Sequence, residues 1–274
     1  VAVTGVQTCA LPIFSYTDGP TLVLAGPGAG KTHLLLGRIL YLIRQGVQAK
    51  RILALTFTRR AAGEMRDRIA DTSMDLPLID TLHAFCWKIQ QEHTPNAKLL
   101  RDDEAFELFL QANSTLSRAE ARHSWDMITK CREECSLDTP NMQIYQEQFQ
   151  NYVQACQAFS TEPVFDFTAL LEETPKLIAR QERLFDAVLV DEVQDCSPLN
   201  IRMLQSLIAP SGDGFFAIGD PDQSIYGFRG ACSDIQTTLH SLYPTLTCFK
   251  LGTSYRSSQD ILNTAQKLLV TPQC

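Results

Sequence analysis

A glycine-rich segment near the start of the chain has the residue types and spacing of a phosphate-binding loop. It follows the apolar run at residues 21–24 and ends in Gly-Lys-Thr. Glycines let the backbone turn tightly, so that successive N–H groups converge on phosphate oxygens. Lys31 would reach the β- and γ-phosphates of a nucleotide, and the Thr32 hydroxyl would complete the shell of a Mg²⁺ ion. The predicted loop is Ala25, Gly26, Pro27, Gly28, Ala29, Gly30, Lys31 and Thr32.

An ordinary glycine-rich turn is the alternative interpretation, and the strict loop pattern has glycine where this chain has Ala25. The residues that follow favour a phosphate site. Leu35, Ile39 and Leu42 form an apolar helical stripe, and Gly46 stands where a helix commonly ends. A helix that begins at the loop would point its positive end at the same anion.

An acidic pair follows a second apolar run. Residues 185–190 have the composition of a buried strand, and Asp191 and Glu192 come directly after it. In a Mg²⁺-dependent phosphoryl site, Asp191 would hold the metal through water, and Glu192 would take a proton from the attacking water. Alone, such a pair is more often a solvated turn. Together with the loop above, it predicts a site that hydrolyses nucleotides.

A third segment, residues 219–231, combines acids, an amide, two aromatic residues and an arginine. Gln223 could bond the γ-phosphate or its water. The rings of Tyr226 and Phe228 could stack on nucleic-acid bases, and Arg229 could stack or pair with a carboxylate. The alternative is that both aromatic residues belong to the core.

Short apolar strands that alternate with helices would position these segments. This alternation predicts a parallel α/β sheet. No glycine occurs in residues 64–211, and much of that stretch has helical periodicity. Asp102 opens one predicted helix, and Thr139 with Pro140 opens another that continues to Val153. The predicted strands are residues 21–24, 52–56, 187–190 and 215–218.

Composition limits the classes of protein that fit. The chain has 274 residues, 45% of them hydrophobic, and a formal net charge of −7, so no overall basic footprint indicates nucleic acid. Nine cysteines in a chain of this length predict reduced thiols and a cytoplasmic location. Cys131 and Cys135 with His123 are a weaker metal candidate. No apolar run approaches the roughly 20 residues of a membrane span, so we expect no membrane association.

The three segments, in this order, resemble motifs of the UvrD/Rep family of superfamily 1 DNA helicases. Residues 52–65 resemble the family's motif Ia, and residues 251–257 its motif IV. Residues 79–86 resemble motif Ib less closely, with Leu82 where an aromatic residue is common. The resemblance covers nearly everything after residue 13. It implies a RecA-like P-loop NTPase fold, an α/β parallel sheet flanked by helices, with an inserted all-helical subdomain.

The resemblance also implies an activity and an ATP site. The full protein would couple ATP hydrolysis to movement along single-stranded DNA in the 3′-to-5′ direction, and would act on 3′-tailed duplex DNA. Lys31, Asp191 and Glu192 would serve catalysis with ATP and Mg²⁺. Three further residues would act at this site: Gln223 on the γ-phosphate, Tyr255 stacked on adenine and Arg256 on phosphate.

A DNA path follows from the same resemblance. Phe57, Tyr226 and Phe228 would line the single strand, with Arg229 beside them and Phe228 in place of a frequent tryptophan. Local positive charge near this path would offset the acidic total, although a solvated charged face is the alternative. The strand's backbone would lie along Thr56, Arg59, Arg60, Thr81 and His83, and the local charge would come from Arg59, Arg60, Arg66, Arg68 and Lys88.

The domain organisation follows from the resemblance and from the two ends of the chain. Residues 3–13, VTGVQTCALPI, resemble the translation of a sequencing-library adapter, so residues 1–13 are expected to be foreign. Residues 14–91 and 163–274 would be two parts of the RecA-like domain, and residues 92–162 the helical insertion. The family's adenine-clamp glutamine would precede the loop, where Gln7 lies in the adapter-like segment. A second RecA-like domain, whose arginine completes the ATP site, is expected beyond Cys274.

Other function classes stay open at this point. A helicase subunit of a RecB/AddA-type helicase–nuclease would differ only in sequence downstream. A nucleotide-gated DNA-binding module without motor activity would share the loop but not need turnover. A P-loop kinase fits less well, because it has no need of the acid–glutamine tract before Tyr226.

Overall fold

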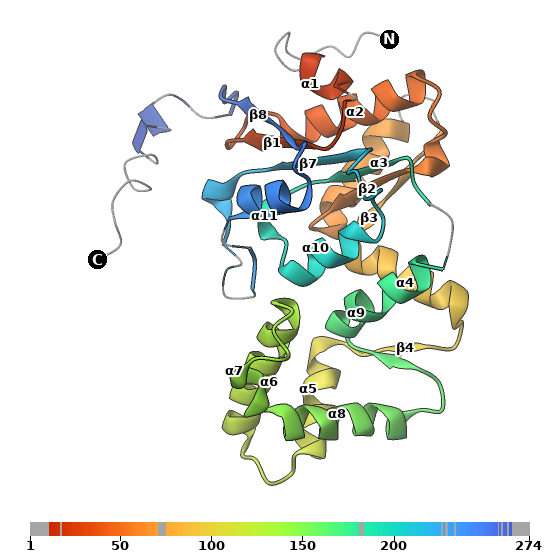
Figure 1. The fold of residues 1–274 in the computed structure, drawn as a ribbon, viewed down its shortest axis with the longest axis vertical. Coiled ribbons are helices and arrows are strands. Elements are labelled where there is room, and N and C mark those ends of the chain that lie inside the picture. Colours follow the sequence, from red (N-terminus) through yellow and green to blue (C-terminus); the bar gives the residue numbers. More distant parts are fainter. Residues whose placement is uncertain are drawn as a thin grey trace.

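The structure is a computed structural model that describes residues 11–16, 18–70, 75–180, 184–225, 227, 230–232, 234–256, 258, 260–261 and 263–264. Its main body is a six-stranded parallel sheet with helices on both faces (Figure 1), which confirms the predicted α/β class. The strand order is β3-β2-β6-β7-β1-β8. The strands are β1 (Thr21–Ala25), β2 (Ile52–Thr56), β3 (Leu78–Thr81), β6 (Ala187–Val190), β7 (Phe215–Gly219) and β8 (Thr247–Leu251).

Two hydrophobic clusters cover the two faces of the sheet, because successive side chains of a strand point to opposite sides. In β1, Leu22 belongs to one cluster and Val23 to the other, and both are fully buried. One face is covered by α1 (Leu11–Ser15), α2 (Lys31–Arg44) and α3 (Arg59–Ala70). The opposite face is covered by α4 (Leu82–His93), α9 (Phe167–Ile178), α10 (Pro198–Gln205) and α11 (Ile235–Leu242).

Helix α2 ends as its sequence predicts. Gly46 has φ +91°, a left-handed conformation that a residue with a Cβ rarely adopts. Its N–H bonds the carbonyl of Ile43, and the N–H of Val47 bonds the carbonyl of Leu42. These two bonds form a Schellman motif, which satisfies carbonyls at the helix end.

Four helices form a separate body beside the sheet (Figure 1). They are α5 (Asp102–Ala112), α6 (Arg118–Glu133), α7 (Pro140–Gln143) and α8 (Gln146–Phe159). Phe106, Phe109, Trp125, Ile128 and Tyr152 are buried in a third hydrophobic cluster of their own. Two short parallel strands lead into and out of this body, β4 (Lys98–Leu99) and β5 (Val164–Phe165). The division at residues 92 and 162 stays a prediction; residue 92 lies in the last turn of α4.

The structure differs from the predicted elements in one helix and in four strands, of which β4 and β5 are the two short strands described above. Strands β3 and β8 were not predicted; they lie at the two edges of the sheet, where only part of each strand is buried and the apolar pattern is weak. The single helix predicted from Thr139 to Val153 is split into α7 and α8 around Tyr145. Thr139 makes no side-chain cap to α7; its hydroxyl donates instead to the Ser136 carbonyl at 2.7 Å.

The remaining predictions about composition concern thiols, metals and membranes. His123 contacts the Tyr145 hydroxyl at 3.3 Å, Cys131 is buried and Cys135 is exposed. Within the described ranges, no group of three or more His, Cys, Asp or Glu side chains could hold a metal ion. No helix in the described part of the chain has both the length and the apolar character needed to cross a bilayer. Ile13, in the adapter-like segment, is buried in the cluster that includes α2.

Candidate active site

The glycine-rich loop connects β1, which lies between β7 and the edge strand β8, to the start of α2. Gly28 and Gly30 have φ +73° and +87°, conformations that favour glycine. The Ala29 N–H closes a turn onto the Gly26 carbonyl at 3.2 Å. Helix α2 begins at Lys31 without a side-chain cap. Backbone N–H groups in its first turn are therefore available to a ligand, at the positive end of the helix. This arrangement suits an anion such as a phosphate.

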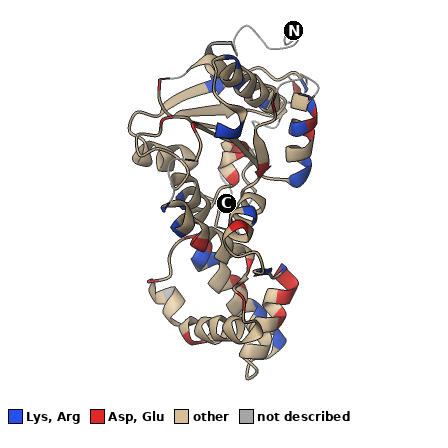
Figure 2. Ribbon diagram, turned by 90° about the vertical axis from the view of Figure 1, so that its right-hand side faces the viewer, with Lys and Arg blue, Asp and Glu red and all other residues tan. Residues whose placement is uncertain are grey.

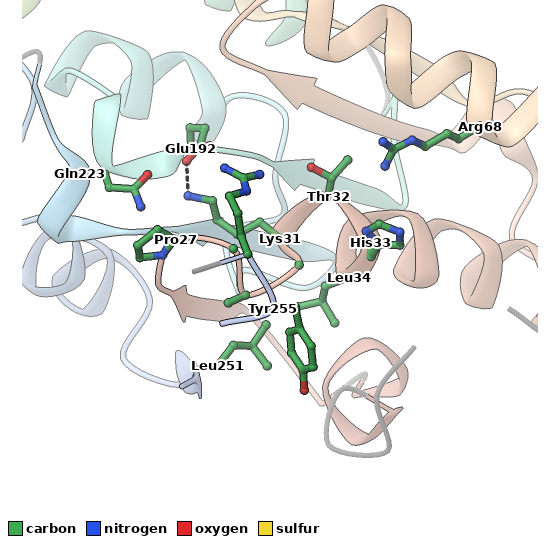
Figure 3. A pocket seen from close by; sticks show the side chains of 14 residues that line it. Pro27, Lys31, Thr32, His33, Leu34, Arg68, Glu192, Gln223, Leu251 and Tyr255 are labelled. Atoms are coloured by element: carbon green, nitrogen blue, oxygen red, sulfur yellow. Dashed lines mark ion pairs between the residues drawn. The ribbon is translucent and has the colours of Figure 1, made fainter. Parts of the chain in front are cut away.

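A cavity of about 540 Å³ lies over this loop (Figure 3). Its wall includes most of the predicted loop and four predicted residues from distant parts of the chain: Glu192, Gln223, Tyr255 and Arg256. Loops at the carboxyl ends of parallel strands meet at one edge of a sheet, which explains how these residues come together. The lining residues are Pro27, Gly28, Ala29, Gly30, Lys31, Thr32, His33, Leu34, Arg68, Glu192, Gln223, Leu251, Tyr255 and Arg256.

An ion pair joins the loop to the acidic pair after β6. The Lys31 Nζ lies 2.8 Å from the Glu192 Oε2, as the dashed line in Figure 3 shows. The Lys31 side chain is 13% exposed and that of Glu192 is 34% exposed, so the pair lies at the wall of the cavity. Glu192 itself has φ 50° and ψ 45°, a left-handed conformation that is uncommon for a residue with a Cβ.

Asp191 is more deeply buried than its neighbour. Burial, and next the charge of Glu192, raise the pKa of the Asp191 carboxyl to about 7, although Lys31 opposes the shift. Its Oδ1 accepts the N–H of Glu192 at 3.0 Å. Asp191 is absent from the cavity lining given above, whereas Glu192 is part of it.

The segment after β8 packs directly on the glycine-rich loop. The Ser254 hydroxyl donates to the Pro27 carbonyl at 2.7 Å, and the Tyr255 N–H donates to the Gly28 carbonyl at 3.0 Å. A Cβ at Gly28 would lie 2.5 Å from the Arg256 Cβ, so a glycine is needed there. The Tyr255 side chain is 63% exposed at the cavity mouth.

The amide of Gln223 faces the cavity from the turn after β7. Its Nε2 donates to the Asp220 Oδ2 at 2.6 Å. Asp220 is buried, and burial is the main cause that raises the pKa of its carboxyl. Gln223 is therefore bonded to the buried Asp220 and also lines the cavity.

The residues predicted to follow a DNA strand divide into two groups. Phe57, Arg59 and Arg60 are exposed at the carboxyl end of β2, although Arg60 pairs with Glu64 in the same helix. Thr56 is buried, and its register partner in β3 is Thr81. The Thr81 hydroxyl caps α4 by accepting the Ala84 N–H, and the Thr56 hydroxyl donates to the Thr58 carbonyl.

His83 is half-buried, with its ring edge-on to Phe167 at 5.6 Å between centroids. Burial lowers the pKa of its imidazole, and the charge of Asp102 opposes that shift. Three of the predicted DNA contacts, Tyr226, Phe228 and Arg229, lie outside the described residues.

Four lining residues were not predicted at this site: the apolar Leu34 and Leu251, and the basic His33 and Arg68. His33 follows Thr32 in the first turn of α2, and that position next to the loop was an available signal. Arg68 was grouped with the predicted DNA path, but the structure places it at the cavity from α3. Its neighbour Arg66 donates to the Ile79 carbonyl at 2.7 Å and so binds the sheet edge. Sequence spacing alone did not show that Arg68 lines the cavity whereas Arg66 bonds the backbone of β3.

Comparison with known proteins agrees with this geometry. The family model of the UvrD/REP helicase N-terminal domain matches residues 9–244. The chain belongs to the UvrD/REP helicase family. This match confirms the family resemblance and includes the loop, the acidic pair and the turn with Gln223.

Relatives within the family extend the match over most of the chain. "ATP-dependent DNA helicase PcrA" of Leuconostoc citreum is 30% identical over 294 residues, covering 92% of this chain and 37% of the relative. "DNA helicase II" of Escherichia coli (strain K12) is 30% identical over 277 residues, covering 90% and 38%. "ATP-dependent DNA helicase Rep" of Buchnera aphidicola subsp. Acyrthosiphon pisum (strain APS) is 28% identical over 281 residues, covering 92% and 43%. The chain thus spans about two fifths of the length of these relatives.

Proposed function

We propose that this chain is the ATP-binding part of a DNA helicase that moves 3′-to-5′ along single-stranded DNA. The observation that carries the proposal is the 2.8 Å contact between Lys31 of the glycine-rich loop and Glu192 of the acidic pair, in the wall of one cavity. Family membership and the printed names of the relatives support ATP as the nucleotide and DNA as the track.

The predicted residues that line the cavity have the following roles in this proposal. The loop amides and Lys31 bind the β- and γ-phosphates, and Arg256 binds phosphate from the other wall. The exposed ring of Tyr255 stacks on adenine at the mouth of the cavity. Glu192 takes the proton from the attacking water, and Gln223 contacts the γ-phosphate or that water.

The residues also fit a Mg²⁺ ion. Thr32 lines the cavity, and the buried Asp191 directly precedes the lining residue Glu192. Both side chains offer oxygen atoms, and Asp191 would reach the ion through water. Mg²⁺ uses few protein ligands and takes the others from phosphates and water. When bound, the ion would neutralise charge on the phosphates and favour the ionised form of Asp191.

The DNA strand would cross the carboxyl ends of β2 and β3, where Phe57, Arg59 and Arg60 are exposed. An aromatic ring beside arginines suits stacking on the bases, with the arginines paired to the phosphates of the DNA backbone.

The seven described cysteines are free thiols, which supports a cytoplasmic location. Protein partners and a second RecA-like domain remain part of the proposal for the whole protein.

Glu192→Gln tests the proposal against a nucleotide-gated binding module. The variant keeps the size of the side chain but cannot accept the proton, so ATP hydrolysis should fall about 10²- to 10⁴-fold while ATP and DNA binding persist. Single-turnover hydrolysis of radiolabelled ATP suits this chain, because we expect it to turn ATP over poorly by itself. Anisotropy of labelled single-stranded DNA measures the second property.

The matched control is Glu173→Gln, which removes an exposed carboxylate that pairs with Lys176 on α9. Its hydrolysis rate should equal that of the unchanged chain. Equal rates for Glu192→Gln and the unchanged chain would indicate the binding module instead. Brisk, DNA-stimulated hydrolysis by these 274 residues alone would contradict our expectation for the chain.

A further inference from the structure

One buried amide connects the two strand ends that carry Glu192 and Gln223. Gln194 lies in the 3₁₀ turn Val193–Asp195 after β6, and its side chain is 3% exposed. Its Nε2 donates to the Glu192 Oε2 at 3.0 Å and contacts the Asp195 Oδ2 at 3.4 Å. Its Oε1 accepts the N–H of Asp220, beyond β7, at 3.0 Å. Donors face carboxylates and the acceptor faces an N–H, so the orientation of the amide is fixed by its partners.

The fold leaves room for this amide. A Cβ at Gly219, the last residue of β7, would clash with the Gln194 Oε1, so a side chain there would displace the amide from its present position. The Ser224 hydroxyl donates to the backbone carbonyl of Gln194 at 3.3 Å. Gln223 lies in the chain between Asp220 and Ser224, which both bond Gln194. Its own amide donates to the Asp220 Oδ2 at 2.6 Å. The places of Glu192 and Gln223 therefore depend on the same buried side chain.

Glu192 needs such support. Its left-handed backbone, with φ 50°, is disfavoured for a residue with a Cβ and persists only where surrounding contacts hold it. Its Oε2 receives both contacts, from the Lys31 Nζ at 2.8 Å and from the Gln194 Nε2 at 3.0 Å. Within the described residues, its other oxygen, Oε1, has no hydrogen bond or ion pair.

The two partners of Glu192 differ in what else they must do. Lys31 lines the cavity and, by the proposed function, also binds phosphates, so a nucleotide competes for its charge. Gln194 does not line the cavity, and its other contacts are with the Asp195 carboxylate and the backbone N–H of Asp220. Its hold on Glu192 is therefore independent of the nucleotide.

We propose that Gln194 is a positioning residue: its amide holds the Glu192 carboxylate toward the attacking water and sets its place relative to Gln223. The proposal rests on the proposed function, in which Glu192 is the base. It goes beyond that function because Gln194 does not line the cavity and would act only through Glu192 and the turn after β7.

Gln194→Met tests the role in catalysis. Methionine has a similar length but makes none of the three amide contacts. We expect single-turnover hydrolysis of ATP to fall about 10- to 100-fold, as for a misplaced catalytic group, while the dissociation constant for Mg·ATP changes less than about threefold. Gln205→Met is the matched control, since Gln205 is exposed on α10, away from the cavity, and its variant should hydrolyse ATP at the unchanged rate.

A second measurement uses no hydrolysis and needs no variant that folds poorly. In the chain labelled with ¹⁵N-glutamine, the Gln194 side-chain amide protons should exchange slowly with water, both without nucleotide and with Mg²⁺ and a non-hydrolysable ATP analogue. Glu192→Gln should shift this NMR signal, because it removes the charged acceptor. Fast exchange, or protection lost on adding the analogue, would overturn the proposal.

The outcomes separate this proposal from the proposed function. If Glu192→Gln abolishes hydrolysis but Gln194→Met leaves the rate unchanged, Glu192 is the base and Gln194 has no positioning role. If Glu192→Gln also leaves the rate unchanged, the proposed function fails whatever the amide does. A loss of Mg·ATP binding equal to the loss of rate in Gln194→Met would indicate general disruption of the site and would overturn the positioning role.

Discussion

At the scale of residues, burial decides the protonation of Asp191. Burial raises the pKa of its carboxyl from 3.8 to about 7, so between these pH values the folded chain holds a proton that the unfolded chain has released. Stability from this group is therefore lost as the pH rises from about 4 to about 7, because the fold must then bury a carboxylate beside Glu192. The nearby Lys31 reduces this loss without removing it.

Asp191→Asn should remove this pH dependence. Without Mg²⁺, we expect the free energy of unfolding of the variant minus that of the unchanged chain to be about 2 kcal/mol higher at pH 8 than at pH 5, because only the unchanged chain loses stability over this range. Urea denaturation at the two pH values measures the difference. If the variant and the unchanged chain differ by the same free energy of unfolding at pH 5 and at pH 8, Asp191 does not titrate in this range.

Gly28 is a second residue whose surroundings give a prediction. Its φ is +73°, and an added Cβ would lie 2.5 Å from the Arg256 Cβ and 2.8 Å from the Ser254 Oγ. Gly28→Ala should therefore destabilise the chain by about 1–3 kcal/mol. Gly26→Ala is the control, because nothing lies within 4 Å of its Cβ position. Urea denaturation in the absence of nucleotide should show a loss for Gly28→Ala alone; matching losses would contradict this explanation.

Much of the cavity wall could be predicted from residue types, but some could not. The loop at residues 25–32, Glu192 and Gln223 each follow an apolar strand, and parallel strands bring their carboxyl ends to one edge. The place of Arg68 depends on the direction of α3, which the sequence does not show. The contacts of Gln194 depend on the absence of a side chain at Gly219, which is 25 residues away in the sequence. No local sequence pattern reveals that the two residues meet.

At the scale of elements, a buried ionic network joins the four-helix body to the sheet body. Arg132 on α6 is 3% exposed and makes bidentate contacts with Asp166 and Glu172, at 2.8–3.1 Å. The Tyr152 hydroxyl donates to Asp166, whose other oxygen caps α9 at the Ala169 N–H. Burial favours the neutral acid, but Arg132 and these hydrogen bonds hold the pKa of Asp166 below its usual value.

Arg132→Met should destabilise the chain by about 3–5 kcal/mol, because it leaves two carboxylates without their buried cation. Lys176→Met is the control: its ion pair with Glu173 is exposed and should be worth at most about 1 kcal/mol. Chemical denaturation of both variants measures the difference. Equal losses would mean that the network does not hold the two bodies together.

The elements themselves were partly predictable. Four strands with strong apolar runs were found at their observed places, as was the helix opened by Asp102. Edge strands β3 and β8 were missed, because an edge needs less apolar sequence. The break between α7 and α8 was also missed, since periodicity alone does not show where a helix bends to pack on α6.

At the scale of the whole molecule, charge is mixed rather than segregated. Basic and acidic residues occur along the same helices in both bodies (Figure 2), as in α3, where Arg60 pairs with Glu64. The net charge of −7 therefore gives no broad attraction to DNA. DNA binding in our account depends on the local group at the ends of β2 and β3, and it should weaken steeply with salt.

The central claim is that the cavity over the glycine-rich loop binds Mg·ATP. The direct test is titration of the chain with a fluorescent ATP analogue, with and without Mg²⁺, for the unchanged protein and for Lys31→Ala. We predict saturable, Mg²⁺-dependent binding at one site, weakened at least about 10-fold, or about 1.4 kcal/mol, by Lys31→Ala, and unchanged by Lys176→Met. Equal affinity of Lys31→Ala and the unchanged chain, or no saturable binding at all, would contradict the account.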